Sequence, residues 1–156
     1  MLIGVVSDTH GSLHPRLVPI LRESGVELIL HAGDVGNVSI LSTLGEVALV
    51  HAVRGNVDHS PGIGDLPVQV RLELGGVHLF MTHVGGKPAS WLPALPLPRP
   101  DIAICGHSHM PLTEQFGGVL FLNPGAAGTQ PRFGTPLSAA ILRIEQGGAK
   151  AELIQL

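Results

Sequence analysis

Five short polar motifs interrupt the apolar stretches of this 156-residue sequence in a fixed order. They are Asp8-Thr9-His10, Gly33-Asp34, Gly55-Asn56-Val57-Asp58, His83 and Gly106-His107-Ser108-His109. Mn, Fe, Co, Ni and Zn accept imidazole nitrogen together with carboxylate or amide oxygen, and they need no thiolate. The aspartate, asparagine and histidine side chains of these motifs therefore suffice for a pair of metal ions.

A dinuclear metal centre predicts a particular chemistry. A carboxylate such as Asp34 can bridge two cations, while each histidine offers one neutral nitrogen. Two metals roughly 3.5–4 Å apart activate a water, orient a phosphoryl group and neutralise its charge. A single aspartate after a strand is more often a turn or cap residue, but the joint order of the motifs favours a site that hydrolyses phosphate esters.

The motifs follow predicted strands, which would bring them together. Short apolar runs predict strands at 2–6, 28–32, 47–53 and 102–105, and helical patterns are predicted at 14–24 and 38–44. In open α/β sheets, ligands bind in the crevice beyond the carboxyl ends of the strands. We therefore expect the polar motifs to meet at one edge of the sheet.

The second half of the sequence has a different pattern. The pairs Gly75-Gly76, Gly117-Gly118 and Gly147-Gly148 lie between strand-like runs and predict antiparallel hairpins. The segment 88–100 contains five prolines, so it predicts an irregular surface segment without a long helix. Exposed apolar residues around Trp91-Leu92 would offer a contact for a homo-oligomer.

Composition limits the class of protein. The length favours one domain over 1–156. The net charge of -3 and the scattered Lys and Arg residues disfavour long nucleic acids as partners. The single cysteine, Cys105, excludes an internal disulfide framework and is expected to pack as a small buried residue. Without a secretory signal or membrane-spanning pattern, we expect a cytoplasmic protein that binds no membrane.

The motif order SDTHG, GD, GN-x-D, H and GHSH resembles that of the calcineurin-like metallophosphoesterases. The small size, Asn123-Pro124-Gly125 and Gln130-Pro131-Arg132 are similar to the bacterial and archaeal branch of small phosphodiesterases, which is related to a retromer subunit. This resemblance implies an α/β fold, a four-layer αββα sandwich of two mixed β-sheets flanked by helices. The metal site would lie at the strand ends.

The resemblance also implies ligands by position. One metal would take Asp8, His10, Asp34 and His109, and the other would take Asp34, Asn56, His83 and His107. Asp34 would bridge the two ions and a metal-bound hydroxide would be the nucleophile. Asp58 would hold the site by hydrogen bonds rather than bind metal. Mn is the favoured metal, with Fe, Ni, Co and Zn left open.

Three positions depart from the pattern of the family. Val57 stands where many relatives have a histidine that protonates the leaving oxygen, so a dedicated general acid is missing there. Val84 follows His83 in place of glycine, and Ala126 stands where relatives often have serine. Neither change removes a metal donor. His31, within an apolar run before a motif, is as readily a hydrogen-bonded core residue as a substrate contact.

These features rank three functions. The leading hypothesis is a metal-dependent phosphodiesterase that acts on a small organic phosphate ester. The alternative is a noncatalytic scaffold of the same fold that binds a protein partner, and its signature would be lost ligands, of which this sequence shows none. A nuclease ranks last because the sequence shows no basic groove.

Overall fold

The computed structural model describes residues 1–132, 134–146 and 148–156, and its strands form two sheets. The strands of the first sheet are β1 (Leu2–Val6), β2 (Leu28–His31), β3 (Leu49–Ala52), β9 (Ser138–Glu145) and β10 (Gly148–Gln155). Those of the second are β4 (Gln69–Leu74), β5 (Val77–Thr82), β6 (Ile102–Ile104), β7 (Leu112–Phe116) and β8 (Val119–Asn123). The helices are α1 (Leu17–Glu23), α2 (Val38–Gly45), α3 (Pro88–Trp91) and a 3₁₀ turn, η1 (Leu92–Ala94).

Both sheets combine parallel and antiparallel pairs. The first has the order β10-β9-β1-β2-β3, in which β1, β2 and β3 are parallel and β9 runs antiparallel to both β1 and β10. The second has the order β4-β5-β6-β8-β7, in which β5, β6 and β8 are parallel and the two edge strands antiparallel. The predicted pair of mixed sheets is therefore confirmed.

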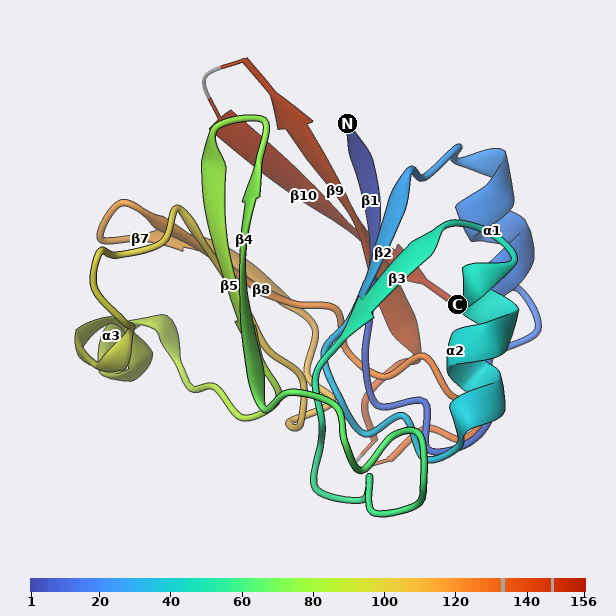
Figure 1. The fold of residues 1–156 in the computed structure, drawn as a ribbon. Helices are drawn as coiled ribbons and strands as arrows, with labels where there is room; N and C mark the ends of the chain where they lie inside the picture. The colour runs from blue at the N-terminus through green and yellow to red at the C-terminus, as the bar shows by residue number, and fades with distance from the viewer. Residues whose placement is uncertain (133, 147) are drawn as a thin grey trace.

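The helices and sheets form the predicted four layers. Helices α1 and α2 cover the outer face of the first sheet, and α3 lies beside the second sheet (Figure 1). Successive side chains in a strand point to opposite faces. Accordingly, Ile3 and Val5 pack in the cluster between the sheets, while Val6 packs in the cluster beneath the helices. The αββα fold class is confirmed.

The predicted helices and hairpins form close to their expected positions. Helix α2 begins after Asn37, whose side chain accepts a hydrogen bond from the Ser39 amide. Gly75 and Gly76 have φ angles of 59° and 80°, the positive values that a tight hairpin turn needs. Strands β9 and β10 also pair antiparallel, although Gly147 lies outside the described residues.

The segment 88–100 contains only the short α3 and η1, in agreement with its prolines. Trp91 and Leu92 are less exposed than expected, and the contact for a homo-oligomer stays a prediction. Both side chains are partly buried against the cluster under α3, and the Trp91 ring lies 5.6 Å from that of Phe121 and 6.5 Å from that of Phe80. Trp91 therefore helps to cover the outer face of the second sheet, together with Leu92 and Leu95.

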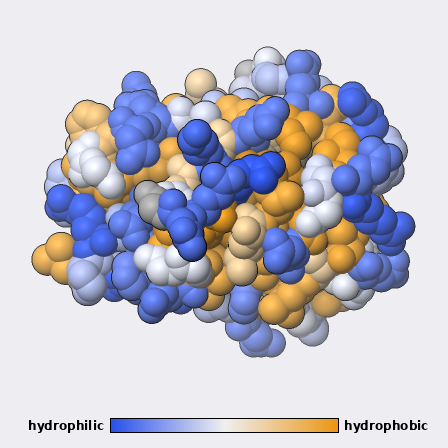
Figure 2. Space-filling view, turned by 90° about the horizontal axis from the view of Figure 1, so that it is seen from above, coloured by the Kyte–Doolittle hydropathy of each residue, from blue (hydrophilic) through white to orange (hydrophobic). Residues whose placement is uncertain are grey.

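Figure 2 shows the end of the molecule that is uppermost in Figure 1, where the N-terminus and the β4–β5 turn lie. Hydrophobic residues are visible there between hydrophilic ones. Strands β1, β2 and β3 run away from this end, so the loops that follow them gather at the opposite end (Figure 1). Among the described residues, no helix is long and apolar enough to cross a membrane.

Candidate metal centre

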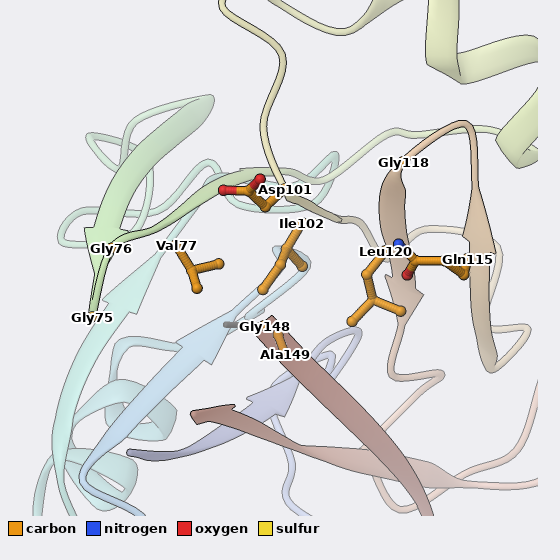
Figure 3. Close-up of a pocket in the computed structure, with 10 residues that line it drawn as sticks. All are labelled: Gly75, Gly76, Val77, Asp101, Ile102, Gln115, Gly118, Leu120, Gly148 and Ala149. Atoms are coloured by element: carbon orange, nitrogen blue, oxygen red, sulfur yellow. The ribbon is translucent and has the colours of Figure 1, made fainter. Parts of the chain in front are cut away.

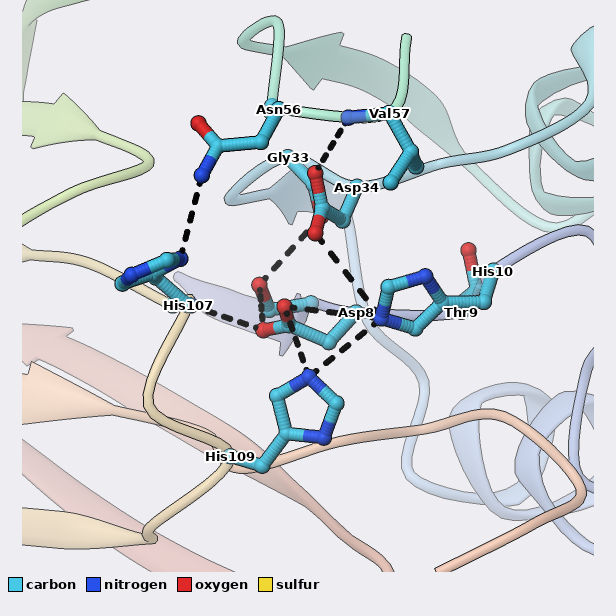
Figure 4. A network of polar contacts seen from close by, with 12 residues as sticks. Asp8, Thr9, His10, Gly33, Asp34, Asn56, Val57, His107 and His109 are labelled. Atoms are coloured by element: carbon cyan, nitrogen blue, oxygen red, sulfur yellow. Dashed lines mark hydrogen bonds and ion pairs between the residues drawn. The ribbon is translucent and has the colours of Figure 1, made fainter. Parts of the chain in front are cut away.

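The predicted ligands come from loops at the carboxyl ends of strands in both sheets. Asp8 follows β1, Asp34 follows β2 and Asn56 follows β3 in the first sheet. In the second sheet His83 follows β5, and His107 and His109 follow β6. The side chains of Asp8, His10, Asp34 and His109 point toward one another (Figure 4). Residues far apart in the chain thus meet in one cluster, as His10 and His109 do across 99 positions.

The backbone of these loops is unusual at the predicted ligands. Within the described residues, every non-glycine residue with positive φ is a predicted ligand: Asp8, His10, Asp34, His107 and His109. Side chains other than glycine rarely adopt this conformation, and such strain concentrates at functional sites. The fold therefore holds these five residues in costly conformations that aim their side chains at one point.

Gly33 and Gly106 of the motifs leave no room for a β-carbon, because other atoms of the site lie close to them. A β-carbon on Gly33 would lie 2.6 Å from Nδ1 of His83. A β-carbon on Gly106 would lie 2.6 Å from Oδ2 of Asp8 and would also collide with the Ser7 hydroxyl. The glycines before Asp34 and His107 thus let the loops of the two sheets touch.

Asp8 is held by one carboxylate oxygen and presents the other. Its Oδ2 accepts hydrogen bonds from the Ser7 hydroxyl at 2.6 Å and from the His107 amide at 3.0 Å. Its Oδ1 is buried without a hydrogen-bond partner among the described residues and lies 3.3 Å from Nε2 of His109. Burial raises the pKa of Asp8 despite the Ser7 hydrogen bond. A buried carboxylate oxygen without a donor suits a cation.

Asp34 faces two histidines with its two oxygens. Oδ1 lies 3.3 Å from Nε2 of His83 and accepts the Val57 amide at 3.0 Å, while Oδ2 lies 3.8 Å from Nε2 of His10. Burial alone would raise the pKa of Asp34, but the His83 and Val57 contacts outweigh it and lower that pKa to about 2. Asp34 is therefore ionised at neutral pH. Its two oxygens face different histidines, as those of a bridging carboxylate would.

His83 presents a fixed nitrogen to the cluster. Its Nδ1 lies 2.8 Å from the Ala32 carbonyl, which can only accept a hydrogen bond, so Nδ1 carries the proton. Nε2 is then a lone-pair donor, and it is buried without a hydrogen-bond partner among the described residues. Burial lowers the pKa of His83, but the Asp34 and Ala32 contacts raise it more, and the net shift is upward.

The donor atoms form two compact groups. One contains Asp8, His10 and His109, and the other contains Asp8, Asp34 and His83. Nε2 of His10 lies 3.3 Å from Nε2 of His109. Burial lowers the pKa of both histidines, with Arg132 adding to the effect, which favours the neutral rings that bind metal. These donors include Oδ1 of Asp8 and Nε2 of His83, which have no hydrogen-bond partner among the described residues, and they fit divalent cations.

Asn56 and His107 lie at one side of the cluster. The Asn56 amide nitrogen is 3.4 Å from Nδ1 of His107, and neither residue belongs to the two compact groups (Figure 4). The structure thus brings all seven predicted ligands to one place. The division of those ligands between two metals, with Asp34 as the bridge, stays a prediction.

Asp58 holds loops rather than facing the cluster. Its buried carboxylate accepts backbone hydrogen bonds from Val35 at 3.2 Å, Gly36 at 2.8 Å and Gly55 at 2.8 Å. It thereby ties the loop after β2 to the loop after β3.

Other groups position the loops, and for His31 the structure supports the interpretation as a hydrogen-bonded core residue. His31 is fully buried, accepts the Gly33 amide at Nδ1 and meets the Thr9 hydroxyl at Nε2, and burial lowers its pKa to about 4. Asn123 donates to the Gly106 carbonyl and to the Ser108 hydroxyl. The sequence signals were proximity for Ser7, directly before Asp8, and for His31, two residues before Gly33, and the Asn123-Pro124-Gly125 pattern for Asn123.

Two cavities differ in their chemistry. One of about 370 Å³ lies at the amino end of β6, opposite the cluster, and is lined mainly by glycine and aliphatic residues (Figure 3). Asp101, the one ionisable residue among its described lining, already accepts the His78 amide. A smaller polar cleft of about 170 Å³ is lined by Asp8, His10, Ser12, Gln130 and Arg132. Of these two cavities, the polar cleft is the one that opens on the predicted ligands.

Comparison with known proteins decides the family. The model of the calcineurin-like phosphoesterase superfamily domain matches residues 1–147. The chain belongs to the calcineurin-like phosphoesterase superfamily. The resemblance drawn from its motifs is therefore confirmed.

Relatives within this superfamily cover nearly the whole chain. A probable metallophosphoesterase of Methanothermobacter thermautotrophicus is 35% identical, over 99% of this chain and 92% of its own length. Phosphodiesterase YfcE of Escherichia coli is 33% identical, over 91% of this chain and 87% of its own. The crystal structure of a Vps29 single mutant from Entamoeba histolytica has a TM-score of 0.76 at 25% identity, covering 100% and 99% of the two chains.

Proposed function

We propose that this protein is a dinuclear metal-dependent phosphodiesterase that hydrolyses small organic phosphate diesters, with Mn²⁺ as its favoured metal. The convergence of the seven predicted ligands carries the proposal, since all lie in loops that meet at one end of the two sheets. The relatives named phosphodiesterase and metallophosphoesterase support it.

When bound, two divalent ions would lower the pKa of an attacking water and neutralise the charge that develops on the phosphoryl oxygens. The chain prepares this centre with fixed donors. Ser7 and the His107 amide hold Oδ2 of Asp8, which leaves Oδ1 as the atom that would bind a metal, and the Ala32 carbonyl fixes the His83 tautomer. Such hydrogen bonds to ligands set their direction and basicity.

The polar cleft beside His10 suits the charge of the substrate. Arg132 lines it and is close enough to act electrostatically on both His10 and His109. A guanidinium group recognises phosphate oxygens through paired hydrogen bonds. Arg132 would therefore bind a phosphoryl oxygen that the metal ions leave uncovered.

The test compares activity against bis(p-nitrophenyl) phosphate in metal-stripped protein and after addition of Mn²⁺, Fe²⁺, Co²⁺, Ni²⁺ or Zn²⁺. We expect no turnover without metal and recovery with Mn²⁺. Asp34→Asn should weaken metal binding at both positions, while Asp101→Asn, at the opposite end, should not. Full turnover in protein shown to be metal-free would exclude the metal mechanism.

The noncatalytic scaffold remains the competing function, because Vps29 proteins share this fold. The exposed Val57, Val84 and Met110, which adjoin predicted ligands, favour it as a protein-binding rim. Metal loading without any phosphoesterase activity, across monoesters and diesters, would support the scaffold over the enzyme.

A further inference from the structure

A second cleft adjoins the metal centre at His107, which lies across the cluster from His10 of the polar cleft (Figure 4). It has a volume of about 590 Å³ and lies between the loop after β5, the loop after β6 and the start of β7. His107, a predicted ligand, is part of its lining, so the cleft begins at the centre itself. We call it the apolar cleft. Its aliphatic walls come from Pro88, Ala89, Met110, Pro111 and Leu112.

The walls of the apolar cleft combine the buried Pro88 with the exposed Ala89 and Met110. Met110 directly follows the ligand His109 and is 62% exposed, although it is a large apolar side chain. Cys105 lines the inner end, and burial raises its pKa to about 12, so it stays an uncharged thiol. Besides His107 and the Cys105 thiol, the ionisable residues of the lining are Lys87 and Glu114. These two side chains carry opposite charges. The cleft thus has no net charge to attract an anion.

The size of the cleft indicates a small molecule. Ligand pockets are typically about 300–1,000 Å³, mostly apolar, with a few polar groups that fix orientation. The polar cleft on the other side of the centre is far smaller, about 170 Å³, and contains Arg132. The two sides of the centre therefore differ in both volume and polarity, which suits a substrate whose two ester groups also differ.

We propose that the apolar cleft binds an aromatic or comparably bulky apolar ester group of the phosphodiester substrate, with Met110 as a specificity-determining residue. The proposal rests on the proposed phosphodiesterase function, because the phosphoryl group is what places the ester group beside His107. It predicts that affinity grows with the apolar area of a single group attached to phosphorus.

The first experiment measures inhibition constants of methylphosphonate, benzylphosphonate and 1-naphthylmethylphosphonate against bis(p-nitrophenyl) phosphate. These probes share one head group and cannot be hydrolysed at the P–C bond. In the wild type we expect the naphthyl probe to bind at least tenfold more tightly than methylphosphonate. Met110→Gln should reduce that ratio about threefold or more. Leu97→Gln, at an exposed leucine outside the cleft, should leave it unchanged.

A second readout does not require activity. Protein labelled at methionine methyl groups gives three signals, since the chain has three methionines, Met1, Met81 and Met110. The naphthyl probe should shift the Met110 signal in zinc-loaded protein, while methylphosphonate should not. Met81 is buried and Met1 lies outside the cleft, so their signals serve as internal references.

The outcomes separate this proposal from the proposed function. Hydrolysis of bis(p-nitrophenyl) phosphate with equal inhibition by all three probes would overturn the apolar cleft as an ester site and leave the phosphodiesterase intact. Absence of hydrolysis would contradict the proposed phosphodiesterase function. In that case the Met110 signal alone tests whether the apolar cleft binds the probe. An unmoved signal at saturating naphthyl probe overturns the proposal.

Discussion

At the scale of single residues, Val57 bears on which side chain could donate a proton to the leaving group in the proposed reaction. Val57 lies beside the cluster, because its amide donates to Asp34, and its side chain is 44% exposed. An aliphatic side chain cannot donate a proton to a departing oxygen. The geometry thus places a residue without acid function beside Asp34, the predicted bridging ligand.

We predict that the rate depends steeply on the pKa of the leaving group. General acid help is typically worth about 10²–10⁴-fold, so alkyl diesters should react much more slowly than nitrophenyl diesters. Val57→His should flatten the dependence, and Val57→Leu, of similar polarity, should not. A flat dependence in the wild type, with the chemical step rate-limiting, would mean that another acid such as His59 or His10 supplies the proton.

His31 carries a prediction about pH and stability. Burial lowers its folded pKa from 6.5 to about 4, so between these values the unfolded chain binds a proton that the folded protein does not. Stability should therefore fall as the pH drops through this window, by roughly 2 kcal/mol between pH 7 and 5. Above pH 6.5 His31 is neutral in both states and adds no pH dependence.

Urea unfolding of metal-stripped wild type and His31→Gln at several pH values provides the measurement. The variant should be less stable overall because it loses the geometry of the Thr9 and Gly33 contacts, but its stability should fall less steeply below pH 6.5. His10 and His109 also have lowered pKa values and contribute a slope that both proteins share. Parallel profiles for the two proteins would contradict the role of His31.

At the scale of elements, the loops after the strands act as one assembly. The loop after β1 runs alongside the loop after β2, where the Asp8 amide donates to the Gly33 carbonyl and the His10 amide to the Asp34 carbonyl. Asp58 then joins the loop after β2 to that after β3. Positive φ at the predicted ligands Asp8, His10 and Asp34 is tolerated because these hydrogen bonds between loops oppose relaxation.

Asp58→Asn should loosen this assembly without touching a metal. An amide nitrogen cannot accept the backbone N–H groups that the lost carboxylate oxygen accepted, and hydrogen bonds to charged groups are worth about 1.5–3 kcal/mol. We expect a loss of roughly 2–3 kcal/mol in urea unfolding and weaker metal binding by calorimetry. Asp101→Asn, where one exposed carboxylate oxygen accepts one amide, is the matched control. An equal loss in both variants would contradict the assembly.

At the scale of the whole molecule, the metal centre spans the two sheets. Asp8, Asp34 and Asn56 belong to the first sheet, and His83, His107 and His109 to the second. Bound ions would link the sheets across the end of the core between them. They would also relieve the repulsion between Asp8 and Asp34, which contributes to the raised pKa of Asp8.

Metal should therefore stabilise the entire fold. A ligand present at 100 times its Kd adds about 2.7 kcal/mol, which corresponds to an increase in Tm of roughly 5–10 °C for a chain of this size. The gain should shrink as pH drops through about 6.5, because histidine ligands must be neutral. Thermal unfolding with and without Mn²⁺ at several pH values measures it. An unchanged Tm at saturating Mn²⁺ would contradict a centre that joins the sheets.

The sequence by itself determined the local elements and the family. The apolar run 2–6 became β1 without change, and Gly75-Gly76 became a hairpin turn, because strand burial and positive φ are decided by neighbouring residues. The fixed order of the motifs predicted both the superfamily and the αββα layers. These features depend on residue type and spacing, which a sequence contains in full.

Only the tertiary structure decided what depends on distant pairs. Sequence did not indicate that β9 pairs with β1, that Trp91 is covered by Phe80 and Phe121, or that Ser7 orients Asp8. Nor did it show the apolar cleft, whose walls come from loops after β5 and β6 and from β7. Such contacts arise from packing one sheet against the other, and packing energy depends on shape in three dimensions rather than on local pattern.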